Sequence, residues 1–374
     1  MRTETLRVDG NGGYEAEIRK AVSVLNGGGL VVFPTETVYG LAANAALPEA
    51  IGRLREVKRR PADKPFTVHV GRPEDLGRYV PSPTSQGRRL ARKGWPGPLT
   101  LIFSVPNPQD APVMTELPAG QEEAIYKSGT IGLRCPNGRP AIDLLTQVEA
   151  PVVAASANPV GEPPATSATE AAGYLDGQVD LILDGGRARY AMPSTIVRVN
   201  EDGCRIVRVG VLDERLIQRM LTLNFLFVCS GNTCRSPMAE GICRKLLAER
   251  LGCPPDALVD CGYVVSSAGT YGMSGGRATP EAVTACASLG VDISGHRAAA
   301  LTPEQINAAD YVFTMTERHI ETVTASLPSA RGTVVRLDPE RDVEDPMGGA
   351  PGLYESLAKR LEDLIRRRLE DIEL

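Results

Sequence analysis

The stretch FVCSGNTCRSPMAE, residues 227–240, combines residue types that could bind and attack a phosphate group. Cys229 supplies a nucleophilic thiol, and Arg235 supplies a planar guanidinium whose N–H groups match phosphoryl oxygens. The residues between them are small or flexible, so their backbone N–H groups can turn inward around an oxyanion. The spacing therefore predicts a phosphate loop that contains its own nucleophile.

The residues on either side of this loop predict a strand before it and a helix after it. The apolar run FLFV would bring Cys229 to the C-terminal end of a strand. Ser236 suits the N-cap of a helix, and Pro237 suits its first position. The free amides and the dipole of a helix N-terminus favour an anion in the loop, and they favour the thiolate form of Cys229.

A zinc or redox-sensing site is an alternative interpretation, because five cysteines occur close together: Cys229, Cys234, Cys243, Cys253 and Cys261. No CxxC pair occurs among them, and the nearby histidines are His296 and His319, which gives zinc little support. Cys243, Cys261 and Cys286 suit small apolar core positions. We expect both histidines to be structural or surface residues.

CSGNTCRSPMAE resembles the phosphate loop of the low-molecular-weight protein phosphatases. The resemblance continues through SSAGTYG, GRATPEAV, GVDISGHRA, ADYVFTMTERH and EDPMGG, and it covers about residues 221–374. It implies a Rossmann-like domain with a parallel sheet and a reaction through a cysteinyl-phosphate. Cys229 would be the nucleophile, Arg235 the phosphate ligand, and Asp345 the proton donor to the leaving group. Asp338, in a second Asp-Pro pair, is its rival.

The same resemblance implies roles for the rest of the loop. Asn232 would hold the loop shape, and Ser236 would hydrogen-bond the Cys229 thiolate. Cys234 could form a reversible disulfide with Cys229 under oxidation. Ser230, Gly231 and Thr233 complete the set of loop and substrate residues.

Thr233 bears on the substrate of this phosphatase-like region. Tyrosine-specific members usually have a branched aliphatic residue at this position, whereas members that act on phosphoarginine in proteins have Thr and an Asp-Pro-Phe-Gly-Gly acid loop. Here the acid loop has Met347 in place of the aromatic residue. A threonine hydroxyl could position a water or a polar guanidinium, so the sequence favours phosphoarginine, with phosphotyrosine as the alternative.

The first two hundred residues place cations near hydroxyl-rich loops. PTETVYGLAANA, residues 34–45, follows the apolar run LVVF, and Lys58 and Arg60 come next. The later segments GWPGPLTLIF, TIGLRCP, AASANPVGEPPAT and STIV continue this pattern. No GxxxxGK[ST] motif is present, so this is not a Walker loop. The residues themselves predict an anion or nucleotide site.

As a set, these segments resemble the YrdC-type threonylcarbamoyl-adenylate synthases over about residues 12–210. The resemblance implies a twisted α/β sheet that converts L-threonine, bicarbonate and ATP into threonylcarbamoyl-AMP and pyrophosphate. Mg²⁺ would accompany the ATP phosphates, and no metal ligand is expected from protein side chains. The product would feed tRNA N6-threonylcarbamoyladenosine synthesis, so tRNA and other tRNA-modification proteins are implied partners. Arg59 and Lys64 depart from the usual family pattern, and both add positive charge.

The resemblance also implies a set of ligand-binding residues. The ATP-binding residues would be Lys58, Arg60, Ala62, Thr130, Ser156, Asn158, Pro164 and Arg208. The threonine-binding residues would be Thr35, Thr67, Arg134, Ala154 and Ser194. Arg134 is the natural partner for the threonine carboxylate.

The chain as a whole predicts two α/β domains, residues 1–220 and 221–374. A helix over 211–221 leads directly into the next strand, and an amphipathic helix is expected over 353–374. The net charge of −5 gives no basic excess, although an N-terminal RNA-binding module joined to a tyrosine phosphatase remains the alternative to two enzymes. We expect no signal peptide, no membrane span and a cytoplasmic location with reduced cysteines.

Overall fold

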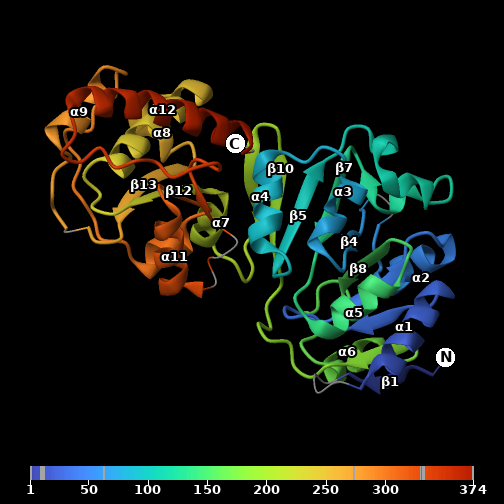
Figure 1. The fold of residues 1–374 in the computed structure, drawn as a ribbon. Helices are drawn as coiled ribbons and strands as arrows, with labels where there is room; N and C mark the ends of the chain where they lie inside the picture. Colours follow the sequence, from blue (N-terminus) through green and yellow to red (C-terminus); the bar gives the residue numbers. More distant parts are fainter. Residues whose placement is uncertain are drawn as a thin grey trace. The chain divides into compact units, whose positions relative to one another are not determined.

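The structure is a computed structural model that describes residues 2–8, 13–61, 64–272, 274–328, 330 and 333–372. The chain divides into two compact units, Met1–Met220 and Leu221–Leu374, and each contains a sheet with helices packed on it (Figure 1). The predicted α/β class is confirmed.

The first unit is built on one mixed sheet in the order β1-β9-β2-β3-β8-β4-β7-β5-β10-β11, with β6 paired to β7. Parallel and antiparallel pairs alternate irregularly, and β4 pairs in parallel with β7 but antiparallel to β8. The strands are β1 (Glu4–Arg7), β2 (Val31–Phe33), β3 (Gly40–Asn44), β4 (Thr67–His69), β5 (Leu99–Ser104), β6 (Tyr126–Lys127), β7 (Thr130–Arg134), β8 (Val152–Ser156), β9 (Leu181–Asp184), β10 (Thr195–Asn200) and β11 (Gly203–Arg208).

The helices of the first unit cover this sheet through apolar faces. On α1, Ile18, Ala21 and Leu25 are buried at the spacing of one helix face, and they share a core with Leu144 of α5. The helices are α1 (Glu15–Asn26), α2 (Pro48–Lys58), α3 (Leu76–Tyr79), α4 (Ser85–Gly94), α5 (Arg139–Gln147), α6 (Ala168–Leu175) and α7 (Glu214–Leu221). The helix predicted over 211–221 is therefore α7, which begins three residues later.

The second unit has a parallel sheet in the order β13-β12-β14-β15. Its strands are β12 (Leu223–Cys229), β13 (Tyr263–Gly269), β14 (Tyr311–Thr314) and β15 (Val334–Arg336). Its helices are α8 (Arg235–Leu251), α9 (Pro280–Ala287), α10 (Pro303–Ala308), α11 (Glu317–Ser326) and α12 (Pro351–Glu370).

Strand β12 is buried on both faces, as expected for a central parallel strand. Phe225, Phe227 and Cys229 face the core that α8, α9 and α12 share, whereas Leu226 and Val228 face the core of α10 and α11. Because both faces of the strand are buried, its sequence is continuously apolar. The burial also fixes the register of β12 and therefore the position of Cys229 at its end.

The start of α8 differs from the sequence prediction. The helix begins at Arg235 with Cys234 as its N-cap residue, so Ser236 is not the cap. Ser236 is fully buried, and its hydroxyl hydrogen-bonds Cys229 and Asn232. The side chain that suits a cap is therefore used to stabilise the preceding loop.

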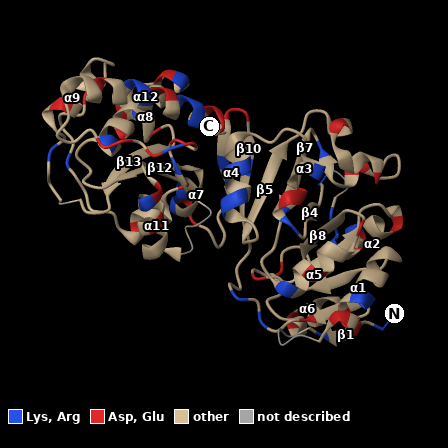
Figure 2. Ribbon diagram, viewed as in Figure 1, with Lys and Arg blue, Asp and Glu red and all other residues tan. Residues whose placement is uncertain are grey.

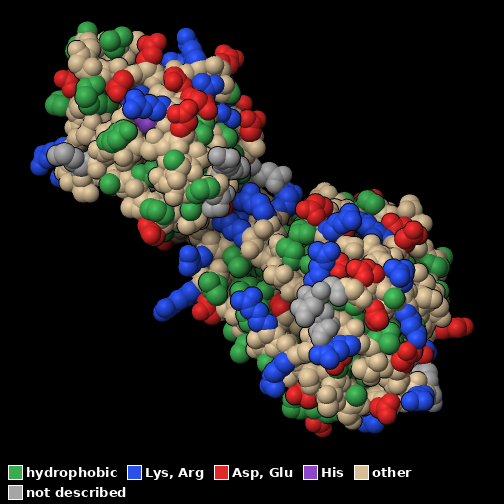
Figure 3. Space-filling view, turned by 60° about the horizontal axis from the view of Figure 1, so that its bottom comes forward, with side chains coloured by type: hydrophobic (Ala, Val, Ile, Leu, Met, Phe, Trp, Pro, Cys, Tyr) green, Lys and Arg blue, Asp and Glu red, His purple; other side chains and the backbone are tan. Residues whose placement is uncertain are grey.

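The surfaces of the two units mix charges of both signs. Lys and Arg alternate with Asp and Glu on both units, with a basic group on α4 (Figure 2). On the face that Figure 3 shows, hydrophobic side chains form small groups among charged ones. Among the described residues, no helix has the length and apolar content needed to cross a membrane.

The core of the second unit generates a stability prediction from two leucines on α12. Leu361 is fully buried and Leu353 is 54% exposed. We expect Leu361→Ala to lower the free energy of unfolding by about 2–5 kcal/mol, because it leaves a cavity. Urea unfolding should be followed through thiol labelling of Cys243 and Cys286, which are fully buried in this unit.

Leu353→Ala is the matched control, and it should change the free energy of unfolding by less than about 0.5 kcal/mol. Fluorescence of Trp95, which lies in the first unit, should be unaffected by either change. Equal effects of the two substitutions would contradict the assigned packing of α12.

Candidate active sites

The loop between β12 and α8 is closed around the thiol of Cys229. The Sγ atom lies 2.9 Å from Ser236 Oγ, and the backbone N–H of Asn232 donates a hydrogen bond to it at 3.3 Å. Cys229 is 3% exposed, and Cys234 is equally buried with a free thiol. Donors that point at a sulfur atom stabilise its negative charge, so this arrangement suits a thiolate nucleophile.

Asn232 fixes the curvature of this loop. Its φ of 55° lies in the left-handed region, which Asn tolerates better than most residues do. The side chain is fully buried, and its Nδ2 donates to Ser236 Oγ and to Ser267 Oγ, at 2.9 and 2.8 Å. Its Oδ1 accepts from the backbone of Ala299 at 2.8 Å. These bonds hold the Ser236 hydroxyl so that its own proton can point at Cys229.

Arg235 is the first residue of α8 and is 4% exposed. Its Nη1 donates to the carbonyl of Val343 at 3.1 Å, and its Nη2 donates to Asp345 Oδ2 at 2.5 Å. The side chain of Asp345 is 47% exposed, so this carboxylate sits between the guanidinium and solvent. The structure therefore brings Cys229, Arg235 and Asp345 to one site.

Asp338, the rival acid, has a different environment. It is 7% exposed, and Arg360 Nη2 donates to its Oδ2 at 2.6 Å. Burial alone would raise the pKa of Asp338, but hydrogen bonds from Arg360 and from the backbone of Glu340 and Arg341 outweigh it and lower the pKa. Its bonds stabilise the turn before the acid loop.

His319 supports the phosphate loop, whereas the sequence indicated only a structural or surface role for it. It is 5% exposed, with Nε2 at 3.0 Å from Ser230 Oγ and Nδ1 at 2.8 Å from Thr316 Oγ1. Burial, followed by repulsion from Arg235, lowers the pKa of His319 to about 4. A neutral His319 therefore lies next to the phosphate loop and adds no charge that competes with Arg235.

Two other residues near the loop have defined surroundings. His296 Nε2 donates to the backbone carbonyl of Asn232 at 2.9 Å. Gly269 ends β13 against the loop, where a Cβ atom would lie 2.6 Å from the carbonyl oxygen of Ser230. Gly269 in the segment SSAGTYG is the sequence feature that could have indicated this close approach. Thr233 is partly exposed, and Met347 is 62% exposed.

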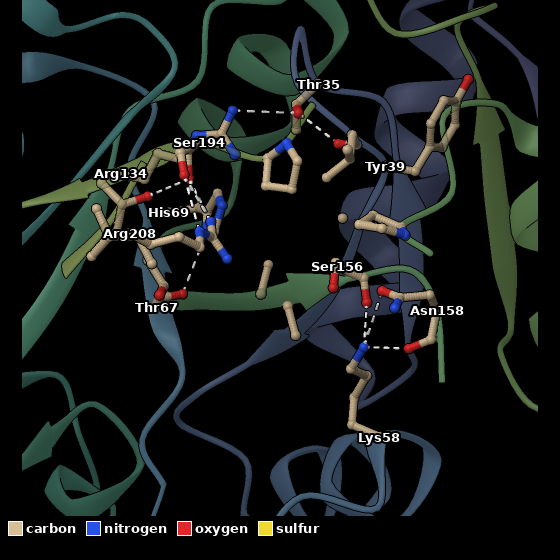
Figure 4. A pocket seen from close by; sticks show the side chains of 18 of the residues that line it. Thr35, Tyr39, Lys58, Thr67, His69, Arg134, Ser156, Asn158, Ser194 and Arg208 are labelled. Carbon is tan, nitrogen blue, oxygen red and sulfur yellow. Dashed lines mark hydrogen bonds between the residues drawn. The ribbon is translucent and has the colours of Figure 1, made fainter. Parts of the chain in front are cut away.

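The first unit contains a cavity of about 360 Å³ that eleven of the predicted ligand-binding residues line: Thr35, Lys58, Arg60, Thr67, Arg134, Ala154, Ser156, Asn158, Pro164, Ser194 and Arg208 (Figure 4). This volume suits a small ligand. Thr130 does not line it, because its hydroxyl donates to Lys127 O in the β6–β7 hairpin at 2.9 Å. Ala62 lies outside the described residues.

Lys58, the last residue of α2, holds the turn after β8. Its Nζ donates to Ser156 O at 2.6 Å, to Asn158 O, and to Asn158 Oδ1 at 3.5 Å (Figure 4). Burial, followed by repulsion from Arg60, lowers the pKa of this ammonium to about 8. The partners are neutral oxygens, so the positive charge remains available to an anion.

Arg60 and Arg208 are also held by backbone carbonyl oxygens. Arg60 Nη2 donates to Pro65 O at 2.6 Å, and the guanidinium lies over the Phe66 ring at 5.0 Å. Arg208 Nη2 donates to Ser194 O at 2.8 Å. Since carbonyl oxygens carry no formal charge, both side chains are positioned without being neutralised.

Arg134 forms a buried ion pair with Glu36, a residue that the sequence analysis did not single out. Its Nη2 donates to Glu36 Oε1 at 2.8 Å and to Thr37 Oγ1 at 2.7 Å. The Nε of Arg134 is buried and has no partner among the described residues, which leaves a donor for a ligand. Glu36 is the one acidic residue of the segment PTETVYG, and it is the sequence feature that could have indicated this ion pair.

The chemistry of the cavity is set by cations and hydroxyl groups. No Asp or Glu occurs among the described residues that line it. Over the same described part of the chain, no group of three or more His, Cys, Asp and Glu could hold a metal ion. The arrangement can therefore bind a polyanion and stabilise negative charge that develops on it.

Comparisons with known proteins divide the chain at the same place. Residues 23–210 match the family model described as telomere recombination, Sua5/YciO/YrdC, and residues 224–373 match that of the low molecular weight phosphotyrosine protein phosphatases. A threonylcarbamoyl-AMP synthase from Pyrococcus abyssi is 35% identical over 207 residues, which cover 55% of this chain and 58% of that protein. The chain thus spans somewhat more than half the length of that relative.

Two further relatives cover the two units. The protein-arginine-phosphatase of Bacillus subtilis is 35% identical over 150 residues, which cover 39% of this chain and 93% of that protein. A solved structure of a Sua5 variant from Pyrococcus abyssi has a TM-score of 0.51 and 26% identity, and the match covers 70% of this chain and 81% of that one.

His319 generates a pH prediction for the second unit. Because its pKa is about 4 in the folded chain and 6.5 for an ordinary histidine, the unfolded chain takes up the proton first as the pH falls. The stability that neutral His319 provides is fully present above about pH 6.5 and is lost as the pH falls towards 4.

The measurement is urea unfolding of the wild type and of His319→Gln at several pH values in this window, followed by labelling of Cys243 and Cys286. We expect the wild type to lose up to about 1.4 kcal/mol per pH unit more than the variant. Parallel pH curves for the two proteins would show that His319 is not held neutral.

Proposed function

Because the chain belongs to the Sua5/YciO/YrdC family over its first unit and to the low molecular weight phosphotyrosine protein phosphatase family over its second, we propose that it is a bifunctional enzyme. The first unit would form threonylcarbamoyl-AMP, with release of pyrophosphate and water, from L-threonine, bicarbonate and ATP. The second unit would dephosphorylate proteins through a cysteinyl-phosphate.

The observation that supports the first activity most is the set of cations held by carbonyl oxygens around one cavity. In the reaction, the threonine amine and bicarbonate condense to a carbamate with loss of water. A carbamate oxygen then attacks the α-phosphorus of ATP, and pyrophosphate leaves. Lys58, Arg60 and Arg208 would stabilise the charge on the phosphates and on the leaving pyrophosphate.

Arg134 would bind the threonine carboxylate through its unpartnered Nε. Mg²⁺ bound with ATP would neutralise part of the phosphate charge. Since the described lining offers no carboxylate, its ligands would be phosphate oxygens and water. The residues present fit an ATP–metal complex better than a metal held by the protein itself.

The observation that supports the second activity most is the Cys229 thiol between Ser236 Oγ and Asn232 N–H. The thiolate would attack phosphorus while Arg235 binds two phosphoryl oxygens. A bound phosphate would replace Asp345 as the partner of Arg235. The released carboxyl group could then protonate the leaving group and later deprotonate the water that hydrolyses the cysteinyl-phosphate.

We propose phosphoarginine in proteins as the preferred substrate of this unit. Thr233 is partly exposed at the loop and presents a hydroxyl where an aliphatic side chain would offer none. The relative from Bacillus subtilis is a protein-arginine-phosphatase, which supports this choice over phosphotyrosine. ATP, threonine and the tRNA that would receive the product occur in the cytoplasm, so we propose that location, with tRNA-modification proteins as partners.

The synthase proposal predicts pyrophosphate release that requires both L-threonine and bicarbonate. We expect Lys58→Ala to lower kcat/KM for ATP by about 100-fold, because it removes a charge at the phosphates and releases the Ser156–Asn158 turn. Cys229→Ser is the control, and it should leave this activity unchanged. Pyrophosphate release that is independent of threonine would contradict the proposal.

The phosphatase proposal predicts faster turnover of phosphoarginine peptides than of phosphotyrosine peptides of the same sequence. Thr233→Ile should reverse this order, since an aliphatic side chain cannot hydrogen-bond a guanidinium or water. Cys229→Ser should abolish turnover of both, and Lys58→Ala should affect neither. An unchanged preference in Thr233→Ile would show that the selectivity lies elsewhere.

A further inference from the structure

The hydroxyl group of Ser230, the residue after Cys229, has no role in the mechanism proposed above. It lies between two side chains of the second unit. Its Oγ is 3.0 Å from His319 Nε2, and Arg235 Nη2 donates to it at 3.5 Å. The same Nη2 atom donates to Asp345 Oδ2, which a phosphoryl oxygen would replace in the proposed mechanism. The Ser230 hydroxyl is therefore next to the phosphate site, and the direction of its O–H bond matters.

The contact with Arg235 does not use the hydrogen of Ser230. A guanidinium has only donors, so the serine oxygen must accept from Arg235. The contact with His319 can run in either direction, because a neutral imidazole has one N–H group and one lone pair. Burial, followed by repulsion from Arg235, keeps this ring neutral by lowering its pKa to about 4. The position of the hydrogen on His319 thus decides what the Ser230 hydroxyl can do.

Thr316 indicates which nitrogen of His319 carries this hydrogen. Its Oγ1 caps α11 by accepting from the backbone N–H of His319, and it lies 2.8 Å from Nδ1 of the same residue. If Thr316 donates to Nδ1, its hydroxyl both donates and accepts, and the hydrogen of the ring must be on Nε2. If Nδ1 held the hydrogen instead, the hydrogen of Thr316 would have no acceptor among the residues that the structure describes. The first arrangement uses more of the available donors.

This arrangement gives the hydrogen bonds one direction, from Thr316 through His319 to Ser230. Nε2 then donates to Ser230 Oγ, which also accepts from Arg235. Both lone pairs of the serine oxygen are occupied. Its own hydrogen has no acceptor within the described part of the chain and must point away from both donors. A hydroxyl whose hydrogen is unused, and which lies beside a buried cation, is suited to donate to an anion.

The opposite arrangement would disfavour a phosphate in the loop. Ser230 would donate to Nε2, and one of its lone pairs would face the phosphoryl oxygens, which carry negative charge. A site that binds phosphate is stabilised by donors that are already aimed at these oxygens. Phosphate binding therefore favours the hydrogen on Nε2 as well.

We propose that the Ser230 hydroxyl donates a hydrogen bond to an oxygen of the phosphoryl group, and that His319 positions this hydroxyl by donating to it from Nε2. This inference rests on the proposed phosphatase function. It adds a side-chain donor to the guanidinium and the backbone N–H groups that would bind the phosphoryl group. His319 acts through Ser230 and is a positioning residue. The ring exchanges no proton with the substrate.

Two substitutions of Ser230 test the donor. Ser230→Ala removes the hydroxyl, whereas Ser230→Thr keeps it. We expect Ser230→Ala to weaken inhibition by inorganic phosphate about 10-fold, and to lower kcat/KM for phosphoarginine and phosphotyrosine peptides by the same factor. Ser230→Thr should stay within about 3-fold of the wild type. A loss confined to phosphoarginine peptides, with unchanged inhibition by phosphate, would overturn the proposal by assigning the hydroxyl to the leaving guanidine.

Two substitutions of His319 test its coupling to Ser230. The amide of Gln can place its NH₂ group near the Nε2 position, whereas Leu offers no donor. His319→Gln should stay within about 3-fold of the wild type, and His319→Leu should match the loss in Ser230→Ala. The double variant Ser230→Ala/His319→Leu should lose no more than Ser230→Ala alone, because His319 acts only through this hydroxyl. Losses that multiply would give His319 an independent structural role and would overturn the proposal.

NMR of the wild-type chain locates the hydrogen directly, so the test does not depend on the folding of His319→Leu. Ring nitrogens with and without a hydrogen have well-separated ¹⁵N chemical shifts, and the chain has three histidines. The signals that are missing from His319→Gln identify His319. At neutral pH and with saturating inorganic phosphate, we expect the hydrogen on Nε2. A hydrogen on Nδ1 would require Ser230 to donate to His319, and it would overturn the proposal.

Failure of the proposed function gives a different result from failure of this inference. If the wild type hydrolyses neither peptide, the phosphatase function fails. If the wild type hydrolyses them and Ser230→Ala is equally active, only the inference about Ser230 fails.

Discussion

Both sites depend on cationic side chains that backbone carbonyl oxygens hold in place. Lys58 donates to the carbonyls of Ser156 and Asn158, Arg208 to that of Ser194, and Arg235 to that of Val343. A carboxylate partner would position a cation equally well, but it would cancel its charge. Carbonyl oxygens leave the charge of Lys58 and Arg208 to attract a phosphate, whereas Arg235 also pairs with Asp345, which a bound phosphate would have to replace. The loops that supply these carbonyls are consequently as important as the cations.

The two units use this principle for different chemistry. In the first, several cations surround a cavity, and in the proposed reaction the substrates would react with each other while the protein orients them and stabilises charge. In the second, the guanidinium of Arg235 is combined with the thiol of Cys229. The left-handed backbone of Asn232 curves the loop so that the N–H group of Asn232 points at this thiol. Here the protein itself would attack the substrate. Among the residues that the structure describes, one cation of each site also pairs with a carboxylate. Arg235 pairs with Asp345, and Arg134 pairs with Glu36.

The sequence predicted the residues that lie at the two candidate sites better than the residues that support them. The apolar run before Cys229 and the small residues after it are local patterns, and they predicted the strand, the loop and the following helix. Ser236 was expected to cap α8, but the three-dimensional loop uses its hydroxyl for Cys229. His319 reaches the loop across 89 residues, and no local pattern reveals such a contact. In the first unit, Glu36 meets Arg134 across 98 residues, which no local pattern reveals either. Thr130 follows the resemblance in sequence, but its hydroxyl is bonded within its own hairpin.

We propose that the first unit is a working synthase in a chain whose second unit carries a phosphate loop. The most direct measurement is the mass spectrum of the products formed from ¹³C-bicarbonate, ATP and L-threonine by the full chain. We expect a threonylcarbamoyl-adenylate that contains the ¹³C label, together with one pyrophosphate per adenylate. The same product should form in the Cys229→Ser chain. ATP hydrolysis to ADP and phosphate, or an adenylate without label or threonine, would show that the first unit is not this synthase.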